Sequence, residues 1–397
     1  MIIEESGGLM ARCGEVFWVF LQLGCTSFGG PAAHIGYFRK AFVEQRQWLN
    51  ESQFAQLLAI SQFLPGPASS QLGFAIGLHR AGWQGAMAAY LAFTTPSVVL
   101  LIGFAALLPV IDPAISGPVL HGLKLVAVAV VSHAVVTMAK SLLADIQRCF
   151  IALLAVLIMV WTDSSWGQML VIIMGAGLGL VLLHHMPAKQ ATAINVPVTE
   201  RVGQSLILVF FGLLVMALLW AGRTEVQNLM ASYYGAGALV FGGGHVVLPL
   251  LDQAVVTPGW VSAADFMAGY GAAQAVPGPM FSLAAFLGYM QGGLGFALLA
   301  VVAIFLPGFL LLAGILPVWH RVTKQAWSGR LVAGVNAAVV GLLVATLYDP
   351  IATSALLQPT DWLLALAAFA LLQWARANAL WIVVLCILAS SILGYFS

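Results

Sequence analysis

The run Gln62-Phe63-Leu64-Pro65-Gly66-Pro67 returns about 212 residues later as Gln274-Ala275-Val276-Pro277-Gly278-Pro279. A second run, Phe28-Gly29-Gly30, returns as Phe241-Gly242-Gly243. Glycine and proline break helices, yet both runs lie inside apolar segments long enough to enter a membrane. Broken helices at matching positions in two halves of a chain are typical of the binding site of a secondary transporter.

The composition of the 397-residue chain excludes a soluble protein. Hydrophobic residues make up 61% of it and charged residues 7%, whereas soluble domains carry about 25% charged residues. The 15 basic and 14 acidic residues balance, so we expect no nucleic-acid partner. The four cysteines lack metal-ligand spacing and are expected to be packing residues.

The apolar runs predict an all-α polytopic membrane protein built from two repeats. Six runs, one extra run and six further runs place equivalent segments an odd number of crossings apart, so the repeats should be inverted in the membrane. We expect an N-terminal repeat at 1–186, a linker and extra helix at 187–227, and a C-terminal repeat at 228–397. The expected segments are 14–36, 52–79, 82–110, 118–143, 148–162, 166–186, 203–222, 228–251, 262–290, 292–318, 330–348, 361–374 and 378–396.

The basic residues leave two topologies open. If every segment crosses and the N-terminus is cytoplasmic, ten basic residues lie inside and four outside. If the broken segments are re-entrant hairpins, thirteen lie inside and only Arg223 lies outside. Both topologies give inverted repeats and a periplasmic C-terminus, and charge favours the hairpins.

The broken segments have chemistry that suits an anion. Each break frees backbone N–H groups, and the helix that restarts after it presents the positive end of its dipole. Ser69 and Ser70 follow the first Pro-Gly-Pro run, and Ser282, the counterpart of Ser70, follows the second. Hydroxyl and amide donors favour a tetrahedral oxyanion over a cation. The alternative is that each run only kinks a helix for packing.

Several titratable residues have two interpretations. His34 and His245 could donate to an anion or carry a proton, or they could be satisfied interior histidines. Lys124 lies inside a predicted segment and is a candidate for anion contact or coupling, or it could snorkel to the surface. Arg39, Lys40 and Arg80 could form an electropositive cytoplasmic vestibule, or they could be ordinary positive-inside anchors.

The residues that we expect to bind substrate come from the broken segments of both halves. No nucleophile–base pair, metal cluster or cofactor motif accompanies them, so we expect no catalytic residues, no metal and no cofactor. The candidates are Gly29, Gly30, His34, Gln62, Pro65, Gly66, Pro67, Ser69, Ser70, Gly242, Gly243, Gly244, His245, Gln274, Pro277, Gly278, Pro279 and Ser282.

These motifs carry a family resemblance. The runs Phe28–His34, Gln62–Pro67 and Phe93–Ser97, with their second-half counterparts, resemble the chromate ion transporter family in its long, duplicated ChrA-type form. The resemblance implies a bacterial inner-membrane protein that exports chromate and confers chromate resistance. The second half departs from the pattern where Gly244 replaces proline and Gly308 replaces serine.

Two other functions stay open at this stage. A sulfate or other oxyanion carrier of the same fold would share the motifs, and an intramembrane enzyme would need paired carboxylates at membrane depth. Most acidic residues lie at segment ends, which disfavours the enzyme. The expected partners are chromate or sulfate and membrane lipid, and a homodimer is an open option.

Overall fold

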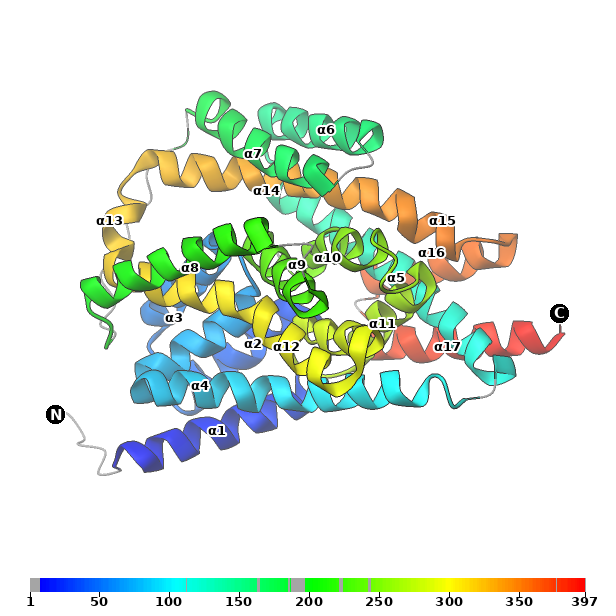
Figure 1. Ribbon diagram of the computed structural model, residues 1–397, viewed down its shortest axis with the longest axis horizontal. Helices are drawn as coiled ribbons and strands as arrows, with labels where there is room; N and C mark the ends of the chain where they lie inside the picture. Colours follow the sequence, from blue (N-terminus) through cyan, green and yellow to red (C-terminus); the bar gives the residue numbers. More distant parts are fainter. Residues whose placement is uncertain are drawn as a thin grey trace.

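The computed structural model describes residues 8–111, 113–162, 165–184, 186, 197–220, 224–241, 244–375 and 377–396. Helices fill most of these residues, and no strand occurs in this part of the chain (Figure 1). The helix boundaries follow the predicted apolar runs, which confirms the all-α membrane fold.

The first repeat contains two broken helices followed by two long ones and a short pair. Its elements are α1 (Leu9–Thr26), α2 (Gly30–Arg39), η1 (Lys40–Gln45), α3 (Glu51–Phe63), α4 (Ala68–Leu107), α5 (Pro113–Leu142), α6 (Ile146–Trp161) and α7 (Ser165–Leu182).

The second repeat has the same order after one extra helix, α8 (Glu200–Trp220). Its elements are α9 (Glu225–Leu239), η2 (Gly244–Val246), α10 (Val247–Leu251), η3 (Asp252–Val256), α11 (Ala263–Ala275), η4 (Met280–Ser282), α12 (Leu283–Ile315), η5 (Leu316–Val318), α13 (Trp319–Thr323), α14 (Ala326–Thr346), η6 (Leu347–Ala352), α15 (Thr353–Ala355), α16 (Pro359–Gln373) and α17 (Ala379–Phe396).

Helix α4 consists of two arms joined by a sharp reversal. Gly82 takes a φ of 63°, a conformation that glycine adopts without strain. Beyond it the second arm folds back on the first, so closely that a Cβ added at Gly77 would collide with the carbonyl of Gly85. Helix α12 reverses at the equivalent place, where Gly293 has a φ of 76°.

The broken segments of the first repeat return to the end at which they start. Glu15, near the start of α1, accepts from Arg80 at the end of the first α4 arm at 3.1 Å and pairs with Arg46 at 3.6 Å. The Arg80 guanidinium also lies 5.1 Å from the centre of the Trp48 ring. The starts and ends of both segments therefore meet in one cluster, which is the geometry of the re-entrant alternative.

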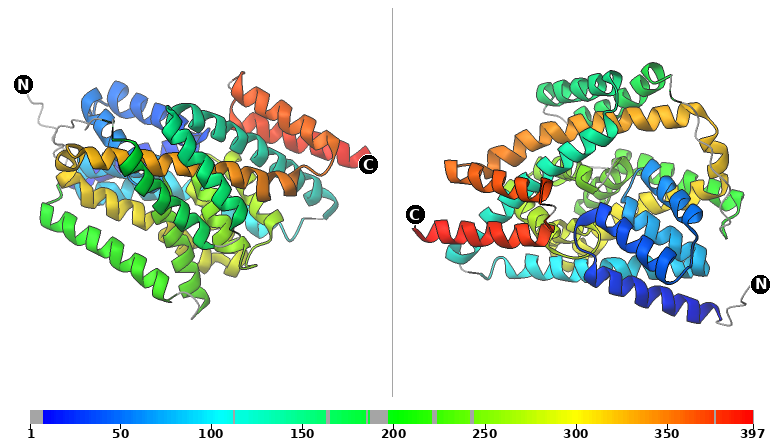
Figure 2. Two further views of the ribbon diagram at one scale, coloured as in Figure 1. Left: turned by 90° about the horizontal axis from the view of Figure 1, so that it is seen from above. Right: turned by 180° about the vertical axis from the view of Figure 1, so that it is seen from behind.

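The two repeats interlock. The short pair α6–α7 of the first repeat packs on α14 of the second, and α16–α17 of the second packs on α5 of the first. Gly122 on α5 approaches the backbone of Cys386, and its counterpart Gly334 on α14 approaches Gly175. Such small-residue contacts let helix backbones pack closely in lipid. Helix α1 begins and α17 ends at opposite ends of the molecule (Figures 1 and 2).

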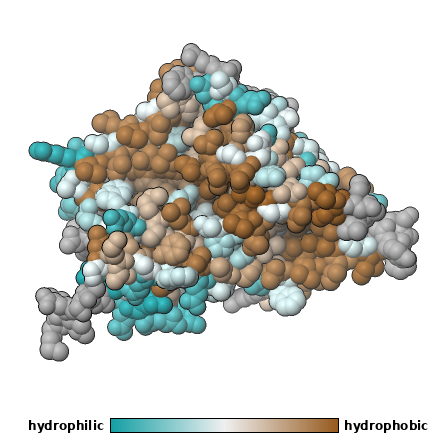
Figure 3. Space-filling model, turned by 60° about the horizontal axis from the view of Figure 1, so that its bottom comes forward, coloured by the Kyte–Doolittle hydropathy of each residue, from teal (hydrophilic) through white to brown (hydrophobic). Residues whose placement is uncertain are grey.

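The surface fits a lipid environment. Five helices of the described chain are long and apolar enough to cross a membrane, and they are α4, α5, α8, α12 and α14. Helix α8 exposes Leu208, Phe211 and Leu219, and apolar side chains dominate the face shown in Figure 3. The chain is therefore a multi-pass membrane protein.

The close approach inside α4 gives a first prediction. Gly77→Leu should lower the free energy of unfolding by about 1–3 kcal/mol or more, because the new side chain overlaps the Gly85 backbone. Gly103→Leu is the matched control, since a Cβ there meets nothing within 4 Å. The midpoint of thermal unfolding in detergent should fall for Gly77→Leu alone, and equal midpoints would contradict the hairpin contact.

Candidate substrate-binding site

The two Pro-Gly-Pro loops are held by reciprocal backbone hydrogen bonds between the repeats. The N–H of Gly66 donates to the carbonyl of Val240 at 2.7 Å, and the N–H of Gly278 donates to the carbonyl of Ser27 at 3.0 Å. Val240 and Ser27 directly precede the two Phe-Gly-Gly runs. Each loop of one repeat is thus bound to the break in the other repeat, at the centre of the molecule.

The loops require glycine because they press against proline-containing helices of the other repeat. Gly66 and Gly278 have φ values of 123° and 101°, a region that favours glycine. A Cβ at Gly66 would lie 2.9 Å from the Cα of Gly308, and one at Gly278 would lie 3.0 Å from the Oγ of Ser97.

Side-chain hydrogen bonds stabilise the contacts of both Pro-Gly-Pro loops, and the bonds differ between the two loops. The amide nitrogen of Gln71 donates to the carbonyls of Pro65 and Gly308, each at 2.9 Å. On the other side the hydroxyls of Ser97 and Ser282 lie 2.6 Å apart. Because Ser97 donates to the carbonyl of Thr94, Ser282 is the donor of that pair. Two residue differences account for this asymmetry: Gly308 stands where Ser97 stands in the first repeat, and Leu283 stands where Gln71 does.

His34 is a satisfied interior histidine. Its Nε2 lies 3.2 Å from the carbonyl of Ser27, so this nitrogen donates, and Nδ1 then accepts from the hydroxyl of Ser69 at 3.3 Å. The side chain is fully buried and packs edge-on against Phe93. It fixes the first glycine break to the start of α4 and does not line the cavity described next.

A cavity of about 740 Å³ lies between α2 and α3 on one side and α5 and α14 on the other. Four of the predicted residues line it, and they are Gly29, Gln62, Gly66 and His245. The cavity therefore joins the Phe-Gly-Gly break and the Pro-Gly-Pro loop of the first repeat to the histidine of the second.

The cavity wall carries cationic and hydrogen-bonding groups. Arg148 contributes a guanidinium that pairs with Asp145 at 3.2 Å. His133 and His245 both line the wall, and His245 Nδ1 forms a hydrogen bond with the hydroxyl of Tyr270 at 2.8 Å. Among the described residues that line this cavity, none is Asp or Glu. The wall thus offers hydrogen-bond donors and one guanidinium, whose charge is partnered by Asp145 behind the wall.

The sequence analysis missed several of these residues. His133 lies within a predicted span, where any titratable residue is a functional candidate, so a signal was present. Arg148 is the first residue of the expected segment 148–162 and has the same pattern as a positive-inside anchor. Trp319 and Asn336 line the same wall, and only the fold brings them near the first repeat.

Most of the other candidate residues lie behind the wall. Gly30 is half-buried in the first break, and Gly244 lies in η2. Gly242 and Gly243 lie outside the described residues. The buried candidates are Pro65, Pro67, Ser69, Ser70, Gln274, Pro277, Gly278, Pro279 and Ser282.

Five unpaired polar atoms lie around the two Pro-Gly-Pro loops and the backbone they contact, which we call the crossed loops, and others lie elsewhere in the described chain. Each of the five is buried and has no hydrogen-bond partner within the described chain, although most buried polar atoms in folded proteins have one. Such atoms are candidates for contact with a polar ligand. They are Ser27 Oγ, Ser70 Oγ, Gln71 Oε1, Thr94 Oγ1 and Gln274 Nε2.

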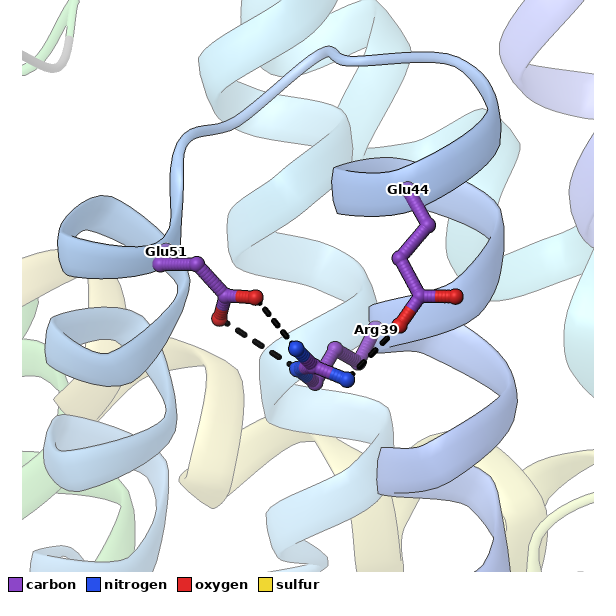
Figure 4. A network of polar contacts seen from close by, with 3 residues as sticks. All are labelled: Arg39, Glu44 and Glu51. Atoms are coloured by element: carbon purple, nitrogen blue, oxygen red, sulfur yellow. Dashed lines mark hydrogen bonds and ion pairs between the residues drawn. The ribbon is translucent and has the colours of Figure 1, made fainter.

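Two of the vestibule candidates are already paired with carboxylates. Arg39 donates to Glu44 at 2.7 Å and to both oxygens of Glu51 (Figure 4), and its hydrogen bonds to the Glu51 carboxylate raise the pKa of Arg39. Arg80 pairs with Glu15. Neither arginine lines the cavity.

Lys40 and Lys124 also lie away from this cavity. Lys40 is exposed at the start of η1. Lys124 is half-buried on α5, and its repeat counterpart Asn336 is the residue that lines the cavity.

Fold and cavity together define a polytopic membrane transporter with two inverted repeats. The sequence profile of the chromate transporter family matches residues 14–180 and 227–391, and the chain belongs to that family.

Curated relatives include chromate transport proteins. The protein of that name from Pseudomonas aeruginosa is 30% identical over 84% of this chain and 80% of its own length. The one from Cupriavidus metallidurans is 28% identical over 90% and 87%. A probable chromate transport protein from Synechococcus elongatus is 28% identical over 82% and 81%. No solved structure matches the chain.

The Gln71 bridge gives a second prediction. Gln71→Leu should destabilise the protein by about 1–3 kcal/mol, because the carbonyls of Pro65 and Gly308 lose a buried donor. Gln22→Leu on the exposed face of α1 is the matched control. Thermal unfolding in detergent should separate the two variants, and equal midpoints would show that the bridge contributes little.

Proposed function

We propose that this chain is a secondary transporter that exports chromate from the cytoplasm and thereby confers chromate resistance. The observation that carries the proposal is the cavity wall, which presents Arg148, two histidines, Gln62 and Asn336, and no carboxylate among its described residues. A carboxylate-free wall with amide, imidazole and guanidinium donors suits a tetrahedral dianion. The family membership and the relatives' names support chromate as that anion.

The membrane potential favours export. With the interior negative, each charge moved is worth about 2.3 kcal/mol per 100 mV, so a departing dianion gains about 4.6 kcal/mol at that potential. No coupled ion is therefore required. The proposed location is a bacterial inner membrane with the N-terminus in the cytoplasm and the C-terminus in the periplasm.

Two alternatives follow from the same geometry. A sulfate carrier would use the same donors, since sulfate has the same shape and charge. An enzyme that acts within the membrane would need paired carboxylates or a nucleophile with its base at the site, and the described cavity wall has no carboxylate for that role.

Flux measurements test the proposal. Everted vesicles that carry the chain should accumulate labelled chromate, faster when a potential positive inside the vesicle is imposed, with sulfate and molybdate as competitors. Absence of chromate flux both with and without a pH gradient would refute chromate transport. Stronger competition by sulfate than by unlabelled chromate would favour the sulfate carrier.

Variants of the cavity wall give a third prediction. Arg148→Gln should raise the chromate concentration for half-maximal flux about tenfold, because a hydrogen bond from a charged donor contributes about 1.5–3 kcal/mol and tenfold corresponds to about 1.4 kcal/mol. Lys140→Gln, an exposed position near the end of α5, is the control for lost positive charge. Equal effects of the two variants would exclude a specific role for Arg148.

Residues of the first Pro-Gly-Pro segment give a fourth prediction. Gln62→Ala and Ser70→Ala should each lower chromate flux several-fold at unchanged protein level, because each removes a polar group from the cavity or the crossed loops. Gln22→Ala provides the matched control. Unchanged flux in both variants would move the site away from the loop.

A further inference from the structure

Equivalent positions in the two repeats have different surroundings. Gln62 is exposed to the cavity, whereas its counterpart Gln274 is 7% exposed. Ala59 on α3 also lines the cavity, whereas its counterpart Gly271 on α11 is packed against α5. The repeats share a sequence pattern, yet at these equivalent positions one repeat faces a cavity and the other is packed.

The difference lies in two equivalent helix pairs, α5 with α11 and α14 with α3. Helix α11 packs directly along α5, and a Cβ at Gly271 would collide with the carbonyl of Leu123. The equivalent pair, α3 and α14, is separated by the cavity. One gap is therefore open and the other is closed.

The closed side contains a group that its surroundings do not satisfy. The amide nitrogen of Gln274 is buried and has no hydrogen-bond partner within the described residues, which is unfavourable. If α5 moved away from α11, this amide would face a cavity, as Gln62 does now. Lys124 directly follows Leu123 at the same contact, and its counterpart Asn336 lines the present cavity.

We propose that the chain has a second conformation in which α5 and α11 separate, α3 and α14 close, and Lys124 and Gln274 line the anion path. This inference rests on the proposed transport function and assigns Lys124 a place in it. The second cavity opens on the opposite side of the crossed loops. In that second cavity Lys124 contributes the basic side chain, as Arg148, which is paired with Asp145, does in the present cavity.

The crossed loops make the two openings exclusive. The bonds Gly66–Val240 and Gly278–Ser27 join the repeats at the centre, so a movement of one repeat relative to the other closes one gap as it opens the other. A bound ion can shift a protein from one conformation to another when the two conformations have similar free energies.

Cysteine accessibility tests the second conformation. Gln62→Cys and Gln274→Cys are made separately in a chain whose native cysteines, Cys13, Cys25, Cys149 and Cys386, are replaced. A membrane-impermeant thiol reagent should label position 62 readily and position 274 slowly, each from a different face of the membrane. Added to these chains, Gly271→Ala should raise labelling at 274 at least several-fold and lower it at 62, because α11 no longer fits against α5.

Two further variants control this experiment. Gly235→Ala is the matched control, since a Cβ there meets nothing within 4 Å, and it should change neither labelling rate. If Gly271→Ala does not fold, Ala59→Leu provides the second arm, because a larger side chain on the exposed wall should hinder closure of α3 on α14. That variant should abolish the slow labelling at 274 and keep labelling at 62.

The charge of the reagent tests Lys124. The quantity to compare is the rate of labelling by an anionic thiol reagent divided by the rate for a cationic one. At position 274 this ratio should fall several-fold when Lys124→Gln is added. The ratio at position 62 should not change, and Lys140→Gln should leave both ratios unchanged.

Three results would overturn the proposal. They are a position 274 that stays unlabelled in every folded variant, labelling at 274 from the same face as 62, and a reagent ratio at 274 that is insensitive to Lys124→Gln. These measurements need no chromate. If the chain does not transport chromate but does have the second conformation, flux will be absent and the labelling pattern will be intact. The two failures are therefore distinguishable.

Discussion

The fold depends on the need to satisfy backbone groups that four helix breaks leave unpaired in an apolar environment. An unpaired N–H or C=O in hydrocarbon costs several kcal/mol, and each repeat has a Pro-Gly-Pro and a Phe-Gly-Gly break. The structure pairs them across the repeats, as Gly66 donates to Val240 and Gly278 to Ser27. A single repeat alone would therefore leave backbone groups at its breaks without hydrogen-bond partners. The same requirement places the two loops at one point, where the polar residues that follow them gather.

The sequence contained most of the fold because the relevant signals are local. Apolar length located the helices, and the doubled motifs with an odd number of intervening segments indicated inverted repeats. The basic residues favoured re-entrant hairpins, and the cluster of Glu15, Arg46 and Arg80 shows that geometry. The packing of α6–α7 on α14 could not be predicted from the sequence, because which helices pack together in lipid depends on the shapes of their surfaces.

Part of the cavity wall could be predicted from the sequence, and part of it could not. Gly29, Gln62, Gly66 and His245 line the cavity, and all four come from the doubled motifs. Arg148 and Asn336 reach the same wall from helices far away in sequence. His34 had the same signal as His245, yet both of its ring nitrogens are bonded within the protein. Spacing along a chain cannot distinguish these two outcomes, since they depend on which groups the opposite repeat presents.

The unpaired polar atoms near the loops bear on how such a site can release its ion. Ser27 Oγ, Ser70 Oγ and Gln274 Nε2 are buried without partners in the described chain, and each is unfavourable by about 1–3 kcal/mol. A site whose donors were all paired would gain little from an anion, and one with many charged donors would hold it too tightly. In the proposed site the donors at the loops are neutral hydroxyl and amide groups, and the Arg148 guanidinium is paired with Asp145, a combination that favours moderate affinity for an anion. An anion that pairs these atoms stabilises the conformation in which it contacts both repeats, and this differential stabilisation is what allows binding to shift the conformational equilibrium.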